Sequence, residues 1–392
     1  MRNRKFAIAC SCAIVAILIT GYILVRWQVR TSVPDTLRQA ELHLRNGDYA
    51  AARDVLGGLL WFDPSHPRAL LIVGISLNAD RMFTESVAML EQIPVESPIY
   101  KDAGTALVSS LIHDGQQQRA ETELRQYLSR FPKSTQPRED LLRLYLSQLR
   151  KRAAVAVLQD YRRRYPDDLS VLPHMLDLEA KIVTAQDRVQ ALETADSRHP
   201  GQASVVLALA RAYAQMGITE KARTRFQAAL ELTTDDPLTR ILAAEFHFDS
   251  GDIDTARRLL RLDSGTLPQE AVADDRYPFL LCRMAAQADD ISGAYAHLQQ
   301  AMALRHSDET YVMMQSALLR QMGRVEEAAT AGQEAAQLAE TRKRLMVLSD
   351  ELDRRQPASA HCLEIAELLQ RLGHAGQAGD WRRVAGAGAV VP

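Results

Sequence analysis

The segment RRRYPDD, residues 162–168, contains a proline that recurs at a fixed spacing along the chain. In LSRFPKS, residues 128–134, and DSRHPGQ, residues 196–202, the corresponding prolines lie 34 positions before and after it. The same register holds five prolines: Pro64, Pro98, Pro132, Pro166 and Pro200. A fixed period of this length indicates stacked structural repeats.

Three further positions recur with the same period when these prolines are counted as position 32. Position 20 is most often alanine: Ala52, Ala120, Ala154, Ala222, Ala256, Ala294, Ala328 and Ala378. Position 24 is large and apolar: Leu56, Leu90, Leu124, Leu158, Leu192, Phe226, Leu260 and Leu298. Position 15 is often glycine: Gly47, Gly115, Gly217, Gly251, Gly323 and Gly373. The pattern predicts two helices of about a dozen residues in each repeat, with the glycine ending the first in a left-handed turn.

The spacing also predicts how the two helices of a repeat pack. An alanine at position 20 allows close approach of the second helix to the first. The apolar residue four positions later lies on the same face and points inward. Proline then stops the second helix or opens the next one, where its missing N–H costs little.

The repeat ASVVLALARAYAQMGITEKARTRFQAALELTTDD, residues 203–236, resembles the tetratricopeptide repeat. The family's consensus sites correspond to Leu209, Ala210, Tyr213, Gly217, Ala222, Phe226 and Ala229. The resemblance implies an all-α fold, an α-α superhelix, over residues 33–392, of the membrane-anchored bacterial type. We expect ten repeats, at 33–66, 67–100, 101–134, 135–168, 169–202, 203–236, 237–274, 275–308, 309–342 and 359–392.

Some repeats depart from this pattern. Glu179 and Arg188 occupy apolar sites in 169–202, and Gln315 and Gly332 do so in 309–342. The first repeat carries Gly57 and Gly58 inside its second helix, so these three repeats are expected to be the weaker ones.

Two insertions break the register. Residues 263–275 contain four extra residues, and residues 343–358 form an extra segment whose Leu345, Leu348 and Leu352 predict an extended helix. Insertions in a solenoid often carry binding features. A length variant without a role is the alternative.

The N-terminal stretch FAIACSCAIVAILITGYILV, residues 6–25, is uncharged and long enough to cross a bilayer as a helix. We predict an uncleaved signal anchor there, preceded by a cytoplasmic n-region at 1–5 and followed by a linker at 26–32. Cleavage after the apolar run or at a lipoprotein-like box is the alternative. The basic residues before the run favour export of the solenoid, which would be periplasmic in a bacterium.

Composition excludes some classes of function. The net charge is −2, from 47 Lys+Arg and 49 Asp+Glu, which argues against a nucleic-acid partner bound by bulk charge. Four cysteines without a CxxC pair suggest neither a metal site nor a disulfide framework, and Cys282 and Cys362 are expected to be buried. No catalytic or phosphate-binding motif is present, so we expect neither an enzyme nor a cofactor.

Candidate binding residues follow from the resemblance, which implies that position 9 of each first helix faces a concave groove. That position reads Arg143, Asp177, Arg211, Glu245 and Arg283. The alternating signs suit either a mixed-charge groove for a polar peptide or a ladder of ion pairs between repeats. The carboxylate clamp known in this family is disfavoured, because Leu71 and Ile75 occupy its positions in 67–100.

The expected function is that of a membrane-anchored protein–protein interaction scaffold or assembly factor that binds an unknown protein or peptide. A cytoplasm-facing membrane adaptor that controls protein turnover or biogenesis is the first alternative, and an enzyme with an unrecognised site is the second. RRRYPDD itself is interpreted as the end of a helix whose arginines cap carbonyl groups on a solvated edge.

Overall fold

The computed structural model describes residues 33–180, 185–233, 236–262, 274–305, 307–352 and 358–386. The predicted anchor at 6–25, with its flanks at 1–5 and 26–32, lies outside these residues, as does most of the insertion at 263–275. No helix in the described ranges is both long and apolar enough to cross a membrane.

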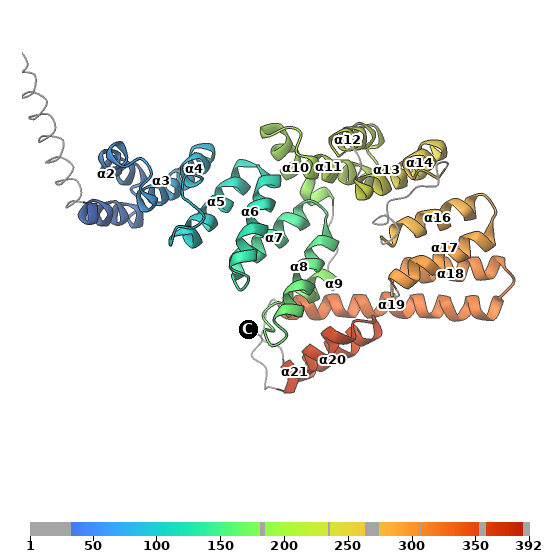
Figure 1. Ribbon diagram of the computed structural model, residues 1–392. Helices are drawn as coiled ribbons and strands as arrows, with labels where there is room; N and C mark the ends of the chain where they lie inside the picture. Colours follow the sequence, from blue (N-terminus) through green and yellow to red (C-terminus); the bar gives the residue numbers. More distant parts are fainter. Residues whose placement is uncertain are drawn as a thin grey trace, which may run out of the picture. The chain divides into compact units, whose positions relative to one another are not determined.

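The described residues fold into helices joined by turns, with no strand among them (Figure 1). A first helix spans 33–45. The helices that follow are α2 (Tyr49–Phe62), α3 (Pro67–Ala79), α4 (Phe83–Leu90), α5 (Tyr100–Asp114), α6 (Gln117–Arg130), α7 (Thr135–Ser147), α8 (Lys151–Arg164), α9 (Leu172–Ala180), α10 (Gln186–Arg198), α11 (Ala203–Gln215), α12 (Thr219–Leu232), α13 (Pro237–Asp249), α14 (Ile253–Leu259), α16 (Arg276–Gln287), α17 (Ile291–Leu304), α18 (Glu309–Gln321), α19 (Val325–Leu352), α20 (Ser359–Arg371) and α21 (Ala375–Gly386). The chain is therefore an all-α array of helical hairpins.

The chain divides into two compact modules. Of the described residues, those from 33 to 140 form module 1 and those from 141 to 386 form module 2. In module 1, α3 packs on α4 and α5 packs on α6. In module 2, the hairpins include α11 with α12, α16 with α17, α18 with α19, and α20 with α21.

The small residue at position 20 explains the close packing within each hairpin. All eight alanines predicted there are at most 1% exposed. Ser86 replaces alanine in one repeat and is also fully buried, where its hydroxyl donates to the carbonyl oxygen of Gly74 at 2.7 Å. The large apolar residues at position 24 are no more than 2% exposed. The predicted core is confirmed.

The turn after each first helix requires a left-handed residue. All six predicted glycines have positive φ, such as +72° at Gly217. In three repeats without glycine, Arg81, Leu149 and Asp289 adopt the same conformation, with φ of +63°, +57° and +62°. The turn geometry is thus kept even where a side chain makes the left-handed conformation unfavourable.

Helix α19 differs from the other second helices because it has 28 residues, whereas α17 has 14. It continues through 343–352, as the apolar spacing predicts, and Leu345 and Leu348 are buried. In module 2 this helix lies against α9, and α21 also contacts α9 (Figure 1). The end of module 2 therefore packs on its beginning.

This return of the chain corrects the interpretation of RRRYPDD. Helix α8 ends at Arg164, and Arg162 donates to the carbonyl oxygens of Tyr165, Pro166 and Asp168, which follow the helix. The predicted solvated edge is wrong for Arg162. Its side chain is only 11% exposed because it pairs with Asp380 of α21.

Candidate binding surface

The five predicted groove residues have different surroundings. Arg143 is exposed on α7. Asp177, on α9, accepts a hydrogen bond from the hydroxyl of Ser349 on α19, so a contact within the chain already engages it. Arg211, Glu245 and Arg283 lie on α11, α13 and α16, and the structure brings these three together.

Arg283 forms two ion pairs on this face, and the one with Glu245 is the longer. The nearest guanidinium nitrogen of Arg283 is 3.9 Å from a carboxylate oxygen of Glu245, and Arg283 also pairs with Asp249. Burial and the nearby negative charge of Asp249 raise the pKa of Glu245, while Arg283, Arg276 and Arg211 oppose the rise. The ladder of ion pairs between repeats is therefore present at this step.

Arg211 has a different environment from Arg283. Its Nη1 donates to the carbonyl oxygen of Leu149 at 2.5 Å, and it forms no ion pair with the described residues. Burial, followed by the like charge of Arg276, lowers the pKa of Arg211 to about 10, and Glu245 only partly offsets this. The guanidinium thus has hydrogen-bonding capacity that an acceptor from outside could use.

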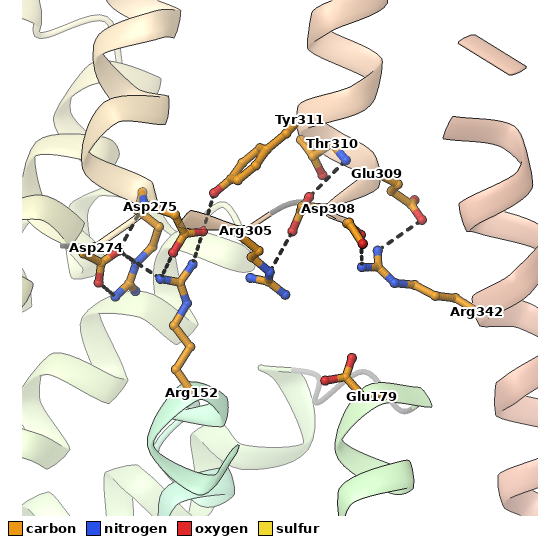
Figure 2. Close-up of polar contacts among 12 residues, drawn as sticks. Arg152, Glu179, Asp274, Asp275, Arg305, Asp308, Glu309, Thr310, Tyr311 and Arg342 are labelled. Atoms are coloured by element: carbon orange, nitrogen blue, oxygen red, sulfur yellow. Dashed lines mark hydrogen bonds and ion pairs between the residues drawn. The ribbon is translucent and has the colours of Figure 1, made fainter. Parts of the chain in front are cut away.

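A second group of charges lies beside this face, where α8 meets the start of α16 (Figure 2). Arg152 reaches from α8 and donates to Asp274 Oδ1 and Asp275 Oδ2, each at 2.9 Å. Arg276 donates through Nε to Asp274 Oδ1 at 2.8 Å. Burial alone would raise the pKa of Asp274, but the bonds from Arg276 and the charge of Arg152 hold it at about 2.

Tyr311 joins this group from α18. Its hydroxyl donates to Asp275 Oδ2 at 2.6 Å, as Figure 2 shows. Burial and this bond raise the pKa of Tyr311 above its ordinary value, so the phenol remains protonated and keeps its role as a donor. One carboxylate, Asp275, therefore connects α8 with α18.

The start of α18 continues the charged surface. Asp308 caps α18 by accepting from the backbone N–H of Thr310 at 3.0 Å, and it pairs with Arg305 at 3.4 Å. Arg342 of α19 contacts Glu309 at 3.3 Å and donates to the carbonyl oxygen of Ser307 at 2.9 Å. Figure 2 shows these contacts beside the Arg152 group.

Glu179 faces these cations from α9. His374, which precedes α21, approaches it at 3.3 Å. Burial would raise the pKa of Glu179, but His374, Lys151 and Arg305 outweigh that effect and lower it. The sequence contained a signal here, since a glutamate at a consensus apolar site indicates that the site does not face an ordinary core.

Three of the residues missed by sequence reasoning belong to the two insertions. Asp274 and Asp275 belong to 263–275, and Ser349 belongs to 343–358. A repeat pattern contains no information about them, because they are the residues that depart from it. Both insertions therefore supply intrachain contacts through their described residues.

The chemistry of this surface is that of charge recognition. No grouping of His, Cys, Asp and Glu suited to a metal ion occurs among the described residues. Cys282 and Cys362 are buried, and burial raises the pKa of the Cys282 thiol to about 11, which disfavours a reactive thiolate. What the arrangement offers is a mixed-charge surface that suits a polar chain.

Neither a protein-family model nor a curated protein sequence matches the chain. Several solved structures are similar to it at low identity. Yeast Tom70 is 11% identical with a TM-score of 0.32, covering 90% of this chain and 88% of that one. A tetratricopeptide repeat protein from Parabacteroides merdae is 13% identical with a TM-score of 0.32, covering 74% and 98%. Pseudomonas aeruginosa PilF is 19% identical with a TM-score of 0.30, covering 55% and 97%. At these scores the superpositions are loose, and the fold assignment rests on the chain's own helices.

Proposed function

We propose that this chain is a membrane-tethered protein-binding scaffold whose partner contacts the face of module 2 formed by Arg211, Glu245 and Arg283. The observation that carries the proposal is the environment of Arg211. It is a half-buried cation near other arginines, and it forms no ion pair within the described ranges of the chain. A partner carboxylate at this point would gain a charge-assisted hydrogen bond and relieve the repulsion among the arginines.

The neighbouring charges support a partner of mixed charge. Glu245 has a raised pKa, so a lysine or arginine of the partner would stabilise its ionised form. Complementary charges of alternating sign contribute more to specificity than to affinity. They select which segment binds and fix its register. A polar peptide with both signs is the expected ligand class.

The tether is proposed from residues 6–25. A membrane anchor confines the binding surface close to its partners, so modest affinities are sufficient for assembly. The charge distribution around the apolar run favours an exported solenoid. The cytoplasm-facing adaptor is the competing topology. A reporter fused after Pro392 separates the two, and activity only in the cytoplasm would exclude export.

Photocrosslinking in native membranes tests the binding face. A photoreactive amino acid is placed at Arg211 or Glu245, and a control is placed at Asp254, which is exposed on α14. We expect both test positions to crosslink the same protein and Asp254 not to do so. Identical products from all three positions, or none from the first two, would refute this surface.

A further inference from the structure

A cleft lies between α19 and α20, next to the extension of α19. Residues 343–352 prolong α19, and α20 lies beside the prolonged helix. Arg344 of the insertion binds Glu364 of α20 in a bidentate pair, with Nε–Oε1 at 2.6 Å and Nη2–Oε2 at 2.9 Å. Between the two helices is a cleft of about 890 Å³. Its principal lining residues are Glu334, Leu338, Glu340 and Thr341 of α19 with Glu367 and Leu368 of α20.

The floor of this α19–α20 cleft is apolar. Leu338 and Leu368 are each 6% exposed, so both are largely buried and present only a small apolar area to the cleft. The hydroxyl of Thr341 donates to its own helix, at the carbonyl oxygen of Gln337 at 2.7 Å. The floor therefore favours an aliphatic or aromatic side chain over a polar one.

The rim of the cleft is acidic. Glu334, Glu340 and Glu367 are exposed, and none of them forms an ion pair with the described part of the chain. Arg371 adds one positive charge to the rim, while Arg344 and Glu364 neutralise each other. The lining thus contains four glutamates and two arginines, an excess of two negative charges.

We infer that the α19–α20 cleft binds a segment of a partner protein that inserts a large apolar side chain between flanking lysines or arginines. The apolar floor would supply affinity through burial, and the three rim carboxylates would select cationic flanks. This inference rests on the proposed protein-binding function, but it concerns a surface separate from Arg211 and Glu245. The α19–α20 cleft, to which the insertion contributes Arg344, would then be a second recognition site.

Fluorescence anisotropy with the full chain in detergent tests the inference. The probe is a labelled peptide of about twelve residues, about 18 Å long as a helix, with leucines on one face and lysines beside them. A matched peptide carries glutamate in place of each lysine. We expect the lysine peptide to bind, and the variant Glu334→Gln, Glu340→Gln, Glu367→Gln to weaken it by about tenfold or more, with the glutamate peptide bound weakly by both proteins.

The control variant removes three exposed carboxylates from other places, by Glu85→Gln, Asp254→Asn and Glu326→Gln. It should bind the lysine peptide as the native chain does, and a photoreactive residue at Gln337 should crosslink that peptide.

The inference would be overturned if the variant with the three rim glutamates replaced bound the lysine peptide within about twofold of native. Equal binding of both peptides by the native chain would also overturn it. Crosslinks from Gln337 confined to this chain, to its own tail or to a second copy, would also overturn it. Because the rim variant leaves Arg211 and Glu245 intact, it still reports on the proposed function through crosslinking at Glu245.

Discussion

Arg162 and Asp380 are separated by 218 positions in the sequence, yet they form a largely buried ion pair. Nη2 of Arg162 lies 2.5 Å from Oδ2 of Asp380, and their side chains are only 11% and 14% exposed. Arg383 reinforces the contact by donating to the carbonyl oxygen of Pro166 at 2.8 Å. The last hairpin of module 2 is therefore fixed to the end of α8.

Removal of the Asp380 carboxylate should release the last hairpin. In Asp380→Ala the guanidinium of Arg162 remains buried without its anion, which typically costs about 3 kcal/mol. We expect a lower melting temperature, together with faster amide hydrogen exchange in α20 and α21 than in α11 and α12.

The adjacent arginine provides the control for this prediction. Arg163 is 77% exposed, and its one ion pair within the described part of the chain is with Asp160 on its own helix, so Arg163→Ala should cost about 0.5 kcal/mol or less. Equal destabilisation by the two substitutions would show that Arg162 acts as an ordinary surface residue.

The regular part of this fold could be predicted from the sequence because each hairpin packs through the same positions of the repeat. The buried alanines, the apolar residues four positions on and the left-handed turns all follow from that local rule. The apolar spacing of Leu345 and Leu348 likewise predicted the extended α19.

The contacts across module 2 could not be predicted in this way. The repeat pattern predicts contacts between adjacent hairpins, but it does not predict which distant hairpins meet. The contacts Arg162–Asp380 and Ser349–Asp177 therefore could not be read from the 34-residue period. The alternating charges at position 9 suggested ion pairs between repeats, and Glu245 with Arg283 forms one. They did not reveal that Asp177 would be bound by α19.

Asp274 should give stability a distinct pH dependence. Its pKa falls from an ordinary 3.8 to about 2 in the folded chain, so its contribution is complete above the unfolded pKa and disappears as the pH falls through about 2. The shift corresponds to about 2 kcal/mol, because one pKa unit equals about 1.4 kcal/mol.

Urea unfolding of native protein and Asp274→Asn at several pH values measures this contribution. The difference in unfolding free energy should be about 2 kcal/mol near pH 6 and should shrink towards zero near pH 2. A difference that stays constant over this range would mean that the carboxylate charge has no part in the Arg152–Asp274–Arg276 contact.

Ala222 should tolerate no larger side chain. It is fully buried where α12 packs on α11, so Ala222→Leu forces the hairpin apart and should cost about 1–3 kcal/mol. Ala228 of the same helix is only half-buried and provides the control. A thermal melt in which Ala222→Leu is as stable as Ala228→Leu would contradict the packing described for position 20.

The left-handed turn predicts opposite effects for two substitutions at equivalent positions. Gly217 has φ of +72°, and Gly217→Ala adds a Cβ that meets no neighbouring atom, so the expected loss of about 1 kcal/mol comes from backbone strain alone. Arg81 already has that strain at φ of +63° with an exposed side chain. Arg81→Gly removes the strain and, after the entropy cost of glycine in the unfolded chain, should stabilise the protein by about 0.5 kcal/mol.

Gly57→Ala, inside α2 where a Cβ would also meet nothing, should stabilise the protein by about 1 kcal/mol through helix propensity. Denaturant midpoints for the three variants measure these signs, and a stabilising Gly217→Ala would contradict the requirement for a left-handed residue at the turn.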